Sequence, residues 1–326
     1  MTSREYEILK ILADGKFHSG QELADSINVS RTAIWKQLNK IREKQLDVRA
    51  IKGRGYQLSE PLELLQADSI LKSISLKPDV SINAINILFS IDSTNQYLLD
   101  ELSKGPIHSR VVLTEHQKRG RGRGINRWES GLGAGIYLSI GWQFALMPKS
   151  YSALSLAVGT VISNCISELS GKSIGLKWPN DLIYEGSKLG GILIESRGQL
   201  AGRMDTVIGI GLNINIFDDI RSKVNQDITD LKEVFGHIPS RNELAAKVIS
   251  NIINLLTEYP DCGFAHYLQD WRVRDISRGK MARLNMAGNI IEGTVVDVDE
   301  QGNLIISVDG KHEKYTSGDL SLRMTN

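Results

Sequence analysis

The first sixty residues carry a segregated charge pattern, and this pattern restricts what the N-terminal part of the chain can fold into. Eight lysines and arginines lie between residues 31 and 54, against only Glu43 and Asp47, which gives a local balance of +6. Residues 1–30 hold three basic and five acidic side chains, a balance of −2. The whole chain has a net charge of only +1, so the cationic surface is local to this segment.

Apolar residues in the same segment recur at helical spacing in three short runs, and a hairpin pattern follows them. Ser19 and Ser30 are placed to cap the second and third helices, the third running from Arg31 to about Gln45. The turn residues Gly53-Arg54-Gly55 separate two short strand-like runs, residues 46–50 and 56–58. Three helices followed by a hairpin predict a winged helix-turn-helix.

The excess positive charge falls on the third helix and the wing, the elements that dock on DNA in such a domain. The alternative is a winged helix used for protein contacts, with its cations merely solvated. Confinement of the charge to the docking elements favours DNA. One module binds weakly, so a homodimer reading two half-sites of an operator is expected. The residues expected to contact DNA are Ser30, Arg31, Thr32, Lys36, Gln37 and Arg54.

At 326 residues the chain is too long for one ordinary core, and we expect several domains. The predicted boundaries are 1–60 for the DNA-binding domain, 61–79 for a linker with a short helix over 62–74, 80–275 for a central domain, and 276–326 for a C-terminal domain. Cys165 and Cys262 lack metal-ligand spacing and are expected to be reduced thiols. The polar N-terminus and the absence of an apolar run near 18–20 residues predict a cytoplasmic protein without membrane contact.

In the central domain, apolar strand-like runs alternate with helical patterns, which predicts a mixed α/β layer and a multi-domain α+β chain overall. Four clusters stand out from this background. They are Asp92-Ser93-Thr94-Asn95; the basic, glycine-rich stretch from His116 to Trp128; Lys177-Trp178-Pro179-Asn180-Asp181 with the following Lys188–Glu195; and Gly209–Asn215. Taken alone, the first reads as a plain helix cap.

The basic stretch combines arginines, whose fork-shaped donors suit phosphate or carboxylate, with glycines that leave main-chain amides free. It follows neither the Rossmann nor the P-loop pattern, because a strand-like segment comes after it. Its place between two strong strands favours a loop that folds over an anionic ligand. An unstructured basic loop is the alternative.

In this order the motifs Ser-Thr-Asn, Gln-x-x-Gly-Arg-Gly-Arg with a later Trp, Lys-Trp-Pro-Asn-Asp, Lys-Leu-x-Gly-Ile-Leu-x-Glu and Gly-x-Gly-x-Asn resemble those of biotin–protein ligases. With the preceding winged helix, the chain is similar to the bifunctional form that also represses the biotin operon. The resemblance covers essentially the whole chain. It implies a biotin/lipoate-ligase-type central domain and an SH3-like β-barrel at the C-terminus, where short strands and turns follow Arg278.

The resemblance also implies a two-step reaction. Biotin and ATP, with Mg²⁺, give biotinyl-5′-AMP, and a lysine of the biotin carboxyl carrier protein of acetyl-CoA carboxylase is then acylated. Biotinyl-5′-AMP would also be the corepressor that promotes dimerisation and operator binding. The catalytic residues implied are Lys188, Arg121, Arg123 and Asp181, the last also as a Mg²⁺ ligand. Those implied for biotin are Ser93, Thr94, Asn95, Gln117, Arg121, Gly122, Arg123 and Lys188. Those implied for the adenylate are Trp128, Lys177, Asn180 and Asn213.

The chain departs from the family pattern in two places. Ile125-Asn126 stands where the basic loop usually continues with another Gly-Arg pair, so loop closure is expected to differ. The segment 224–229 lacks the tryptophan that some relatives carry, which would leave Val224 or Ile228 to cover the adenine.

Two other functions remain open on the sequence. A lipoate ligase of the same superfamily is the nearest rival enzyme, and the Gly-Arg-Gly-Arg loop and the DNA-binding domain argue against it. A ligand-sensing repressor without ligase activity is the rival from another class. Lys177, Lys188 and the arginine loop argue against that reading, since sensing alone requires no stabilisation of a transition state.

Overall fold

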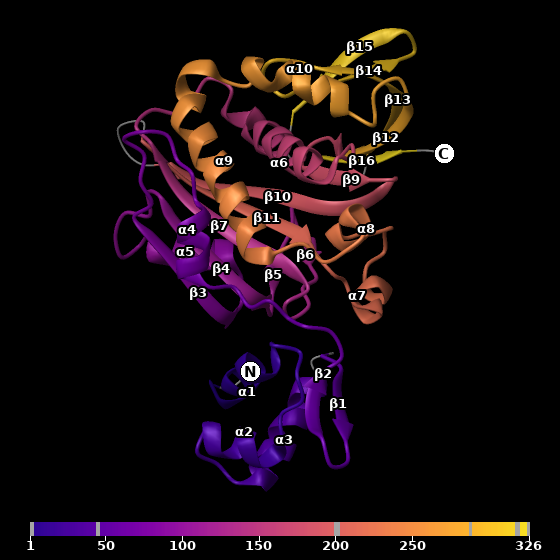
Figure 1. Ribbon diagram of the computed structural model, residues 1–326. Helices are drawn as coiled ribbons and strands as arrows, with labels where there is room; N and C mark the ends of the chain where they lie inside the picture. The colour runs from indigo at the N-terminus through magenta and orange to yellow at the C-terminus, as the bar shows by residue number, and fades with distance from the viewer. Residues whose placement is uncertain (1–2, 44–45, 199–202, 287–288, 317–319, 325–326) are drawn as a thin grey trace.

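The computed structural model describes residues 3–43, 46–198, 203–286, 289–316 and 320–324. Three parts follow one another along these ranges: a small helical domain, a central domain built on a seven-stranded sheet, and a five-stranded C-terminal sheet. Figure 1 shows the N-terminal domain below the central domain and the C-terminal strands at the opposite end.

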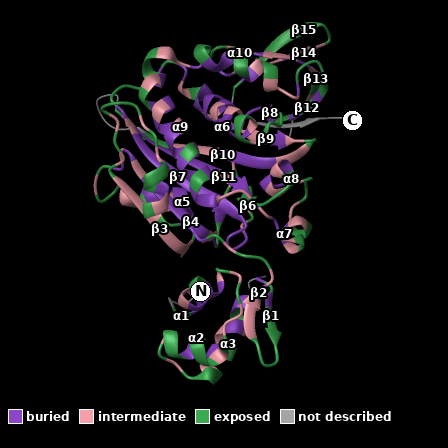
Figure 2. Ribbon diagram, viewed as in Figure 1, coloured by how far each residue is buried: buried purple, intermediate pink, exposed green. Residues whose placement is uncertain are grey.

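The N-terminal domain has the predicted three helices and hairpin. Its elements are α1 (Ser3–Leu12), α2 (Gly20–Ser26), α3 (Arg31–Arg42), β1 (Val48–Ile51) and β2 (Gly55–Leu58). Ser19 and Glu22 form a reciprocal capping box on α2, and Ser30 accepts the Ala33 amide at the start of α3. Helix α3 ends earlier than the predicted Gln45, and residues 44–45 lie outside the described part. A compact core holds the domain together, while the outer faces of α2 and β1 are exposed (Figure 2).

The segment that joins the two domains is more extended than the sequence predicts. A linker helix was expected over 62–74, but α4 covers only Ala67–Ser73. The residues before it are bound along the start of α9 (Arg241–Cys262): the Glu63 carboxylate accepts hydrogen bonds from Ser240, Arg241 and Asn242. Because the main-chain groups of 64–66 also bond to side chains of Glu115 and Asn242, these residues cannot join the helix.

The central sheet has the strand order β3-β4-β7-β11-β10-β9-β8, in which only β3 and β4 are parallel. Its strands are β3 (Ala84–Ile91), β4 (Arg110–Gln117), β7 (Gly135–Phe144), β8 (Gly175–Lys177), β9 (Asp181–Tyr184), β10 (Ser187–Gly198) and β11 (Met204–Asn213). A separate ribbon of β5 (Gly120–Arg121) and β6 (Arg127–Trp128) replaces the expected loop between β4 and β7. This sheet confirms the predicted mixed α/β layer.

Alternate residues along the central strands face opposite layers of the domain. Ile208 and Ile210 belong to the main core, which α6 (Leu154–Ser170), α9 and α10 (Ala265–Arg274) cover. Val207 instead packs in a smaller cluster with residues of α5 (Thr94–Glu101) on the other face. Figure 1 shows the three long helices together on one side of the sheet. The face that carries α5 also carries the β5–β6 ribbon, and the candidate site lies there. The remaining helices are a 3-10 turn (Tyr151–Ala153), α7 (Asp218–Lys223) and α8 (Leu231–Phe235).

One segment departs from the expectation that no apolar run is long enough to span a membrane. Residues Tyr151–Ser170 meet the length and composition for a span, but 61% of the apolar window is buried inside the protein. Helix α6 packs against both the sheet and α9 (Figure 2), so its apolar character serves the core.

The C-terminal part is an antiparallel sheet in the order β15-β14-β13-β12-β16. Its strands are β12 (Met281–Met286), β13 (Asn289–Val298), β14 (Leu304–Val308), β15 (Lys311–Tyr315) and β16 (Leu320–Met324). The predicted small β-domain is confirmed, with one more strand than the sequence indicated. No pairing between the edge strands β15 and β16 closes a barrel within the described residues.

Candidate active site and DNA-binding surface

Glycines on the open face of the central sheet form the floor of the site. A side chain at Gly211 would lie 2.6 Å from the indole of Trp128, and one at Gly209 would collide with the amide of Asn95. Glycine at these two positions therefore lets the β5–β6 ribbon and helix α5 approach the strands closely.

The predicted biotin-binding residues at the start of α5 form one buried network. Ser93 caps the helix, and the Gln117 side chain accepts hydrogen bonds from the Thr94 amide at 2.9 Å and its hydroxyl at 3.2 Å. Ser139 on β7, which the sequence did not single out, donates to the Thr94 hydroxyl at 2.7 Å and lies 2.6 Å from Asn95 Oδ1. The cluster is therefore more than a helix cap, because its polar groups are fixed in a buried wall.

The predicted arginine loop forms a short hairpin, and Arg121 within it is held by α5 and β10. Arg121 donates to the Gln96 side chain at 2.7 Å and pairs with Glu195 at 2.7 Å. The other Glu195 oxygen accepts from Asn95 at 2.9 Å, so one carboxylate joins the arginine to the biotin wall. The Gly122 amide donates to the Asn126 carbonyl, and Ile125 at the tip is fully exposed.

Two lysines converge on one carboxylate next to this loop. Lys188 Nζ lies 2.7 Å from Asp181 Oδ1, and Lys177 Nζ lies 3.6 Å from Oδ2. Only 12% of the Asp181 side chain is exposed. The Lys188 ammonium also lies 5.7 Å from the Trp128 ring centroid. The site thus holds two cations and one anion beside an aromatic face, a set that can stabilise negative charge developing on a bound substrate.

The predicted adenylate-binding residues border this cluster. Trp128 Nε1 is buried and has no hydrogen-bond partner in the structure. The amide groups of Asn180 and Asn213 donate to the carbonyls of Ile192 and Thr229. Main-chain bonds of residues 227 and 229 to Lys188 hold segment 227–229 against the lysine. Ile228 packs there with Ile216 and Ile220, while the role expected for Val224 stays a prediction.

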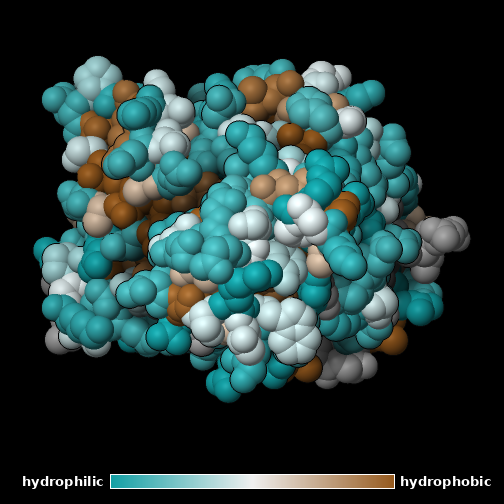
Figure 3. All heavy atoms as spheres, turned by 60° about the horizontal axis from the view of Figure 1, so that its bottom comes forward, coloured by the Kyte–Doolittle hydropathy of each residue, from teal (hydrophilic) through white to brown (hydrophobic). Residues whose placement is uncertain are grey.

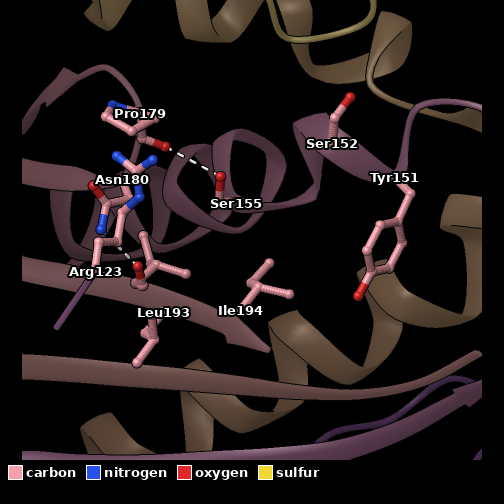
Figure 4. A pocket seen from close by; sticks show the side chains of 9 residues that line it. Arg123, Tyr151, Ser152, Ser155, Pro179, Asn180, Leu193 and Ile194 are labelled. Carbon is pink, nitrogen blue, oxygen red and sulfur yellow. Dashed lines mark hydrogen bonds between the residues drawn. The ribbon is translucent and has the colours of Figure 1, made fainter. Parts of the chain in front are cut away.

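A hollow of about 150 Å³ opens where the arginine loop meets the Trp-Pro-Asn-Asp turn. Figure 4 shows Arg123 beside Pro179 and Asn180 at one end and Tyr151 at the other. Ser155 donates to the Pro179 carbonyl at 3.1 Å. Burial raises the pKa of the Tyr151 hydroxyl, which lies 3.0 Å from the Thr206 hydroxyl. The hollow is therefore bounded by the residues that directly precede Asp181 in the chain, and Arg123 supplies a cation to its lining.

Comparisons with known proteins agree with this geometry. Three family models match in sequence order: an HTH domain over residues 4–57, the biotin/lipoate A/B protein ligase family over 88–215, and the biotin protein ligase C-terminal domain over 279–323. The bifunctional ligase/repressor BirA of Escherichia coli is 35% identical over 97% of this chain and 96% of its own length. The chain belongs to the bifunctional biotin ligase/repressor family.

Two further relatives support this membership. BirA of Bacillus subtilis is 26% identical over 95% of both chains. A biotin protein ligase from Aquifex aeolicus, solved in complex with biotin and ATP, superposes with a TM-score of 0.63 and 26% identity over 75% of this chain and all of its own. Family membership confirms the predicted enzyme class and the predicted union of a ligase with a DNA-binding repressor domain.

The DNA-binding domain of this family member presents a mostly hydrophilic face, which Figure 3 brings toward the viewer. Arg31, Thr32, Lys36 and Arg54 are exposed, as the sequence predicted. The Arg54 guanidinium lies 4.2 Å from the Phe17 ring centroid, and this contact helps to hold the wing in place.

Gln37 is half-buried, and its Oε1 is buried without a partner, so its side chain is less available to DNA than expected. Trp35 is 53% exposed on the same helix, and the sequence reasoning did not name it.

Two contacts of the candidate site were missed because their partners come from distant strands. In the sequence, Glu195 stood out only as the final residue of the Lys-Leu-x-Gly-Ile-Leu-x-Glu motif. A carboxylate in an apolar strand nevertheless requires a partner. Ser139 lies inside an apolar run and carried no signal of its own.

The described residues contain no cluster of three or more His, Cys, Asp or Glu side chains that could hold a metal by themselves. Asp181 is the one carboxylate among the implied site residues, and both lysines already contact it. Such a site fits Mg²⁺ only when substrate phosphates supply most of the oxygens, which is the usual way Mg²⁺ binds with nucleotides.

Proposed function

We propose that the site activates biotin with Mg·ATP and then transfers it to a lysine of the biotin carboxyl carrier protein. In the first step a biotin carboxylate oxygen attacks the α-phosphorus of ATP, forming biotinyl-5′-AMP and expelling pyrophosphate. In the second step a neutral lysine amine attacks the acyl carbon, forming an amide and expelling AMP. The observation that carries the proposal is the convergence of Lys188 and Lys177 on Asp181 beside Trp128 and the arginine loop.

The first step brings two anions together, so its barrier falls when fixed cations offset their repulsion. Arg121 and Lys188 are held by carboxylates in the site, and Arg123 borders the hollow. We assign these three side chains to the biotin carboxylate and the α-phosphate. The wall made by Ser93, Thr94, Asn95 and Gln117 would hold the rest of biotin, with Gly122 shaping the hairpin above it.

The adenylate is assigned to the opposite end of the same floor. Trp128 offers an aromatic ring with an unpartnered indole N–H, and Asn180, Asn213 and Lys177 lie at the neighbouring strand ends. Mg²⁺ enters as part of the substrate Mg·ATP, with Asp181 as the protein carboxylate nearest to it.

Asp181 has a second role in the transfer step. Its carboxylate already contacts two ammonium groups, so it is suited to orient the amine of an incoming lysine. A closed arginine hairpin would keep water from the mixed anhydride during this exchange.

The same chain would repress transcription as a cytoplasmic homodimer. Biotinyl-5′-AMP would order the β5–β6 ribbon, favour dimerisation and raise affinity for an operator, so that repression follows a shortage of unmodified carrier protein. The exposed face of α3 and the wing would contact the DNA through Arg31, Thr32, Lys36 and Arg54, while Ser30 caps the helix. The domain boundaries at residues 60, 79 and 275 remain part of this proposal.

Biotin-dependent exchange between ATP and pyrophosphate tests the ligase assignment. We expect exchange in the wild type and its collapse in Lys188→Ala and Arg121→Ala. Lys172→Ala removes an exposed lysine after α6 and serves as the charge-matched control, with unchanged exchange expected. Exchange driven by lipoate instead of biotin would make the protein a lipoate ligase, and its absence with either acid would leave only a ligand-sensing repressor.

A further inference from the structure

Trp35 is a large aromatic side chain that the fold leaves in solvent. It is 53% exposed, whereas its neighbours Ile34 and Leu38 on α3 are fully buried. Neither the core of the N-terminal domain nor the apolar residues packed against it include Trp35. This exposed indole on an otherwise well-packed helix is therefore not part of the apolar core of the domain.

The surroundings of Trp35 indicate an anionic partner. Arg31 and Thr32 are exposed one turn before Trp35 on the helix, and Lys36 and Lys40 are exposed further along it. The wing adds further exposed cations, among them Arg54. Such charge complementarity fits a nucleic-acid duplex and disfavours a second copy of the same basic surface.

An indole can recognise few features of a base pair. It has one donor, Nε1–H, and no acceptor, so most of its surface is apolar. The apolar feature that the major groove presents is the C5-methyl group of thymine, and the phosphates offer none. A tryptophan at the centre of a groove-facing helix therefore has one chemically matched target.

We propose that Trp35 reads the methyl group of a thymine in each half-site of the operator. The proposal rests on α3 entering the major groove, and it adds a specificity determinant to that docking. The exposed side chains of Arg31 and Lys36 supply affinity through phosphates, which is independent of sequence. Trp35 supplies discrimination without adding charge.

The test uses the full-length protein with biotin and Mg·ATP. Duplexes that bind are selected from a pool with a randomised central segment, and each thymine of the selected motif is then replaced singly by deoxyuridine, which lacks only the methyl group. Loss of the matched methyl should weaken wild-type binding about fourfold, the factor that corresponds to roughly 0.8 kcal/mol for one buried methyl.

The variants separate reading of a base from general affinity. Trp35→Ala should bind thymine and deoxyuridine duplexes equally, while Trp35→Phe, which keeps an apolar ring, should retain part of the difference. Lys36→Ala should weaken binding to both duplexes alike, and it should reduce the salt dependence of binding by about one ion. Far-ultraviolet circular dichroism and thermal unfolding of each variant confirm that the domain is folded.

Any of four results would overturn the inference. If wild type selects a motif but ignores every deoxyuridine, α3 docks without Trp35 reading a methyl group. If Trp35→Ala keeps the discrimination, another side chain reads the base. If no motif is selected, or if Trp35→Ala instead changes the oligomeric state without DNA, the groove docking itself is wrong, while the ligase assignment is untouched.

Discussion

The indole N–H of Trp178 donates a 3.0 Å hydrogen bond to the main-chain carbonyl of Gly302, which ties the C-terminal sheet to the active-site turn. Trp178 is fully buried, and it directly precedes Pro179 and Asn180 at the edge of the hollow. The same C-terminal turn accepts a hydrogen bond at Gln301 from Ser152, which lines the hollow from the other side. The C-terminal domain therefore supports both walls of the hollow.

A methyl group at Gly302 should disturb this support. Gly302 has a φ of +80°, and a Cβ there would lie 2.7 Å from Cβ of Ala153. Gly310, with a φ of +78° and nothing within 4 Å, is the matched control. Gly310→Ala should lose about 1–2 kcal/mol of stability from backbone strain alone. Gly302→Ala should lose roughly 1–3 kcal/mol more from overpacking, and its pyrophosphate exchange should slow. If Gly302→Ala and Gly310→Ala changed thermal unfolding and pyrophosphate exchange equally, the prediction would be contradicted.

Glu195 should matter for biotin affinity because it positions Arg121. Glu195→Gln keeps an acceptor for Asn95 but removes the charge opposite the guanidinium. Since 41% of the Arg121 side chain is exposed, solvent weakens this pair, and we expect the KM for biotin to rise about threefold to tenfold. Glu292→Gln, which breaks an exposed pair with Arg283 on the C-terminal sheet, is the control. The KM is measured from initial rates of pyrophosphate exchange across a biotin titration, and Glu292→Gln should leave it unchanged.

Local patterns in the sequence predicted most of the site, because each motif lies at one strand end or turn. Lys188 and Asp181 come together through the antiparallel pairing of β9 and β10, which a short hairpin already implies. The helices and wing of the N-terminal domain also follow from local periodicity and caps.

The contacts between motifs could not be predicted in this way. The pairing of Arg121 with Glu195 and the position of Ser139 depend on the register of β7, β11 and β10, which no local pattern determines. The linker helix was predicted to be longer than it is for a similar reason. Its apolar pattern continues through Leu64 and Leu65, but hydrogen bonds to Asn242 and Glu115 draw those residues into an extended path.

The pair of Arg241 and Glu115 should be the most sensitive ionic contact at the domain junction. Nη1 lies 2.7 Å from Glu115 Oε2, and both side chains are almost fully buried. The hydrogen bonds of the guanidinium go to the carbonyls of Glu63 and Gly135. Arg241→Met would leave the Glu115 carboxylate buried in the core without its cationic partner. This should cost about 3–5 kcal/mol of unfolding free energy.

A second substitution shows whether the loss of stability in Arg241→Met comes from an unpaired buried charge or from lost packing. Adding Glu115→Gln to Arg241→Met should recover much of the loss, because a neutral amide can still accept the Leu65 amide. Arg272→Met, which breaks a more exposed pair with Asp297, should cost clearly less. Urea unfolding of the three variants measures these differences, and a double variant no more stable than Arg241→Met would refute the ionic explanation.

His18 should make the stability of the DNA-binding domain depend on pH. Its Nδ1 lies 2.8 Å from Glu22 and its Nε2 lies 3.0 Å from Asp14, and both contacts are hydrogen bonds only when the ring is doubly protonated. Burial lowers the pKa of His18, but the hydrogen bonds to Glu22 and Asp14 raise it more, so the net pKa lies above 6.5.

The sign of the effect follows from this raised pKa. The stabilisation is fully present below the unfolded pKa of 6.5 and is lost as pH rises through the folded value. The pKa values of Asp14 and Glu22 are lowered, so their contribution is lost instead as pH falls below their ordinary range near 4. We therefore expect amide protons of α2 in the full-length protein to be best protected between about pH 4.5 and 6.5, after correction for intrinsic exchange. His18→Gln should remove the decline above pH 6.5, and an unchanged decline in that variant would assign it to another group.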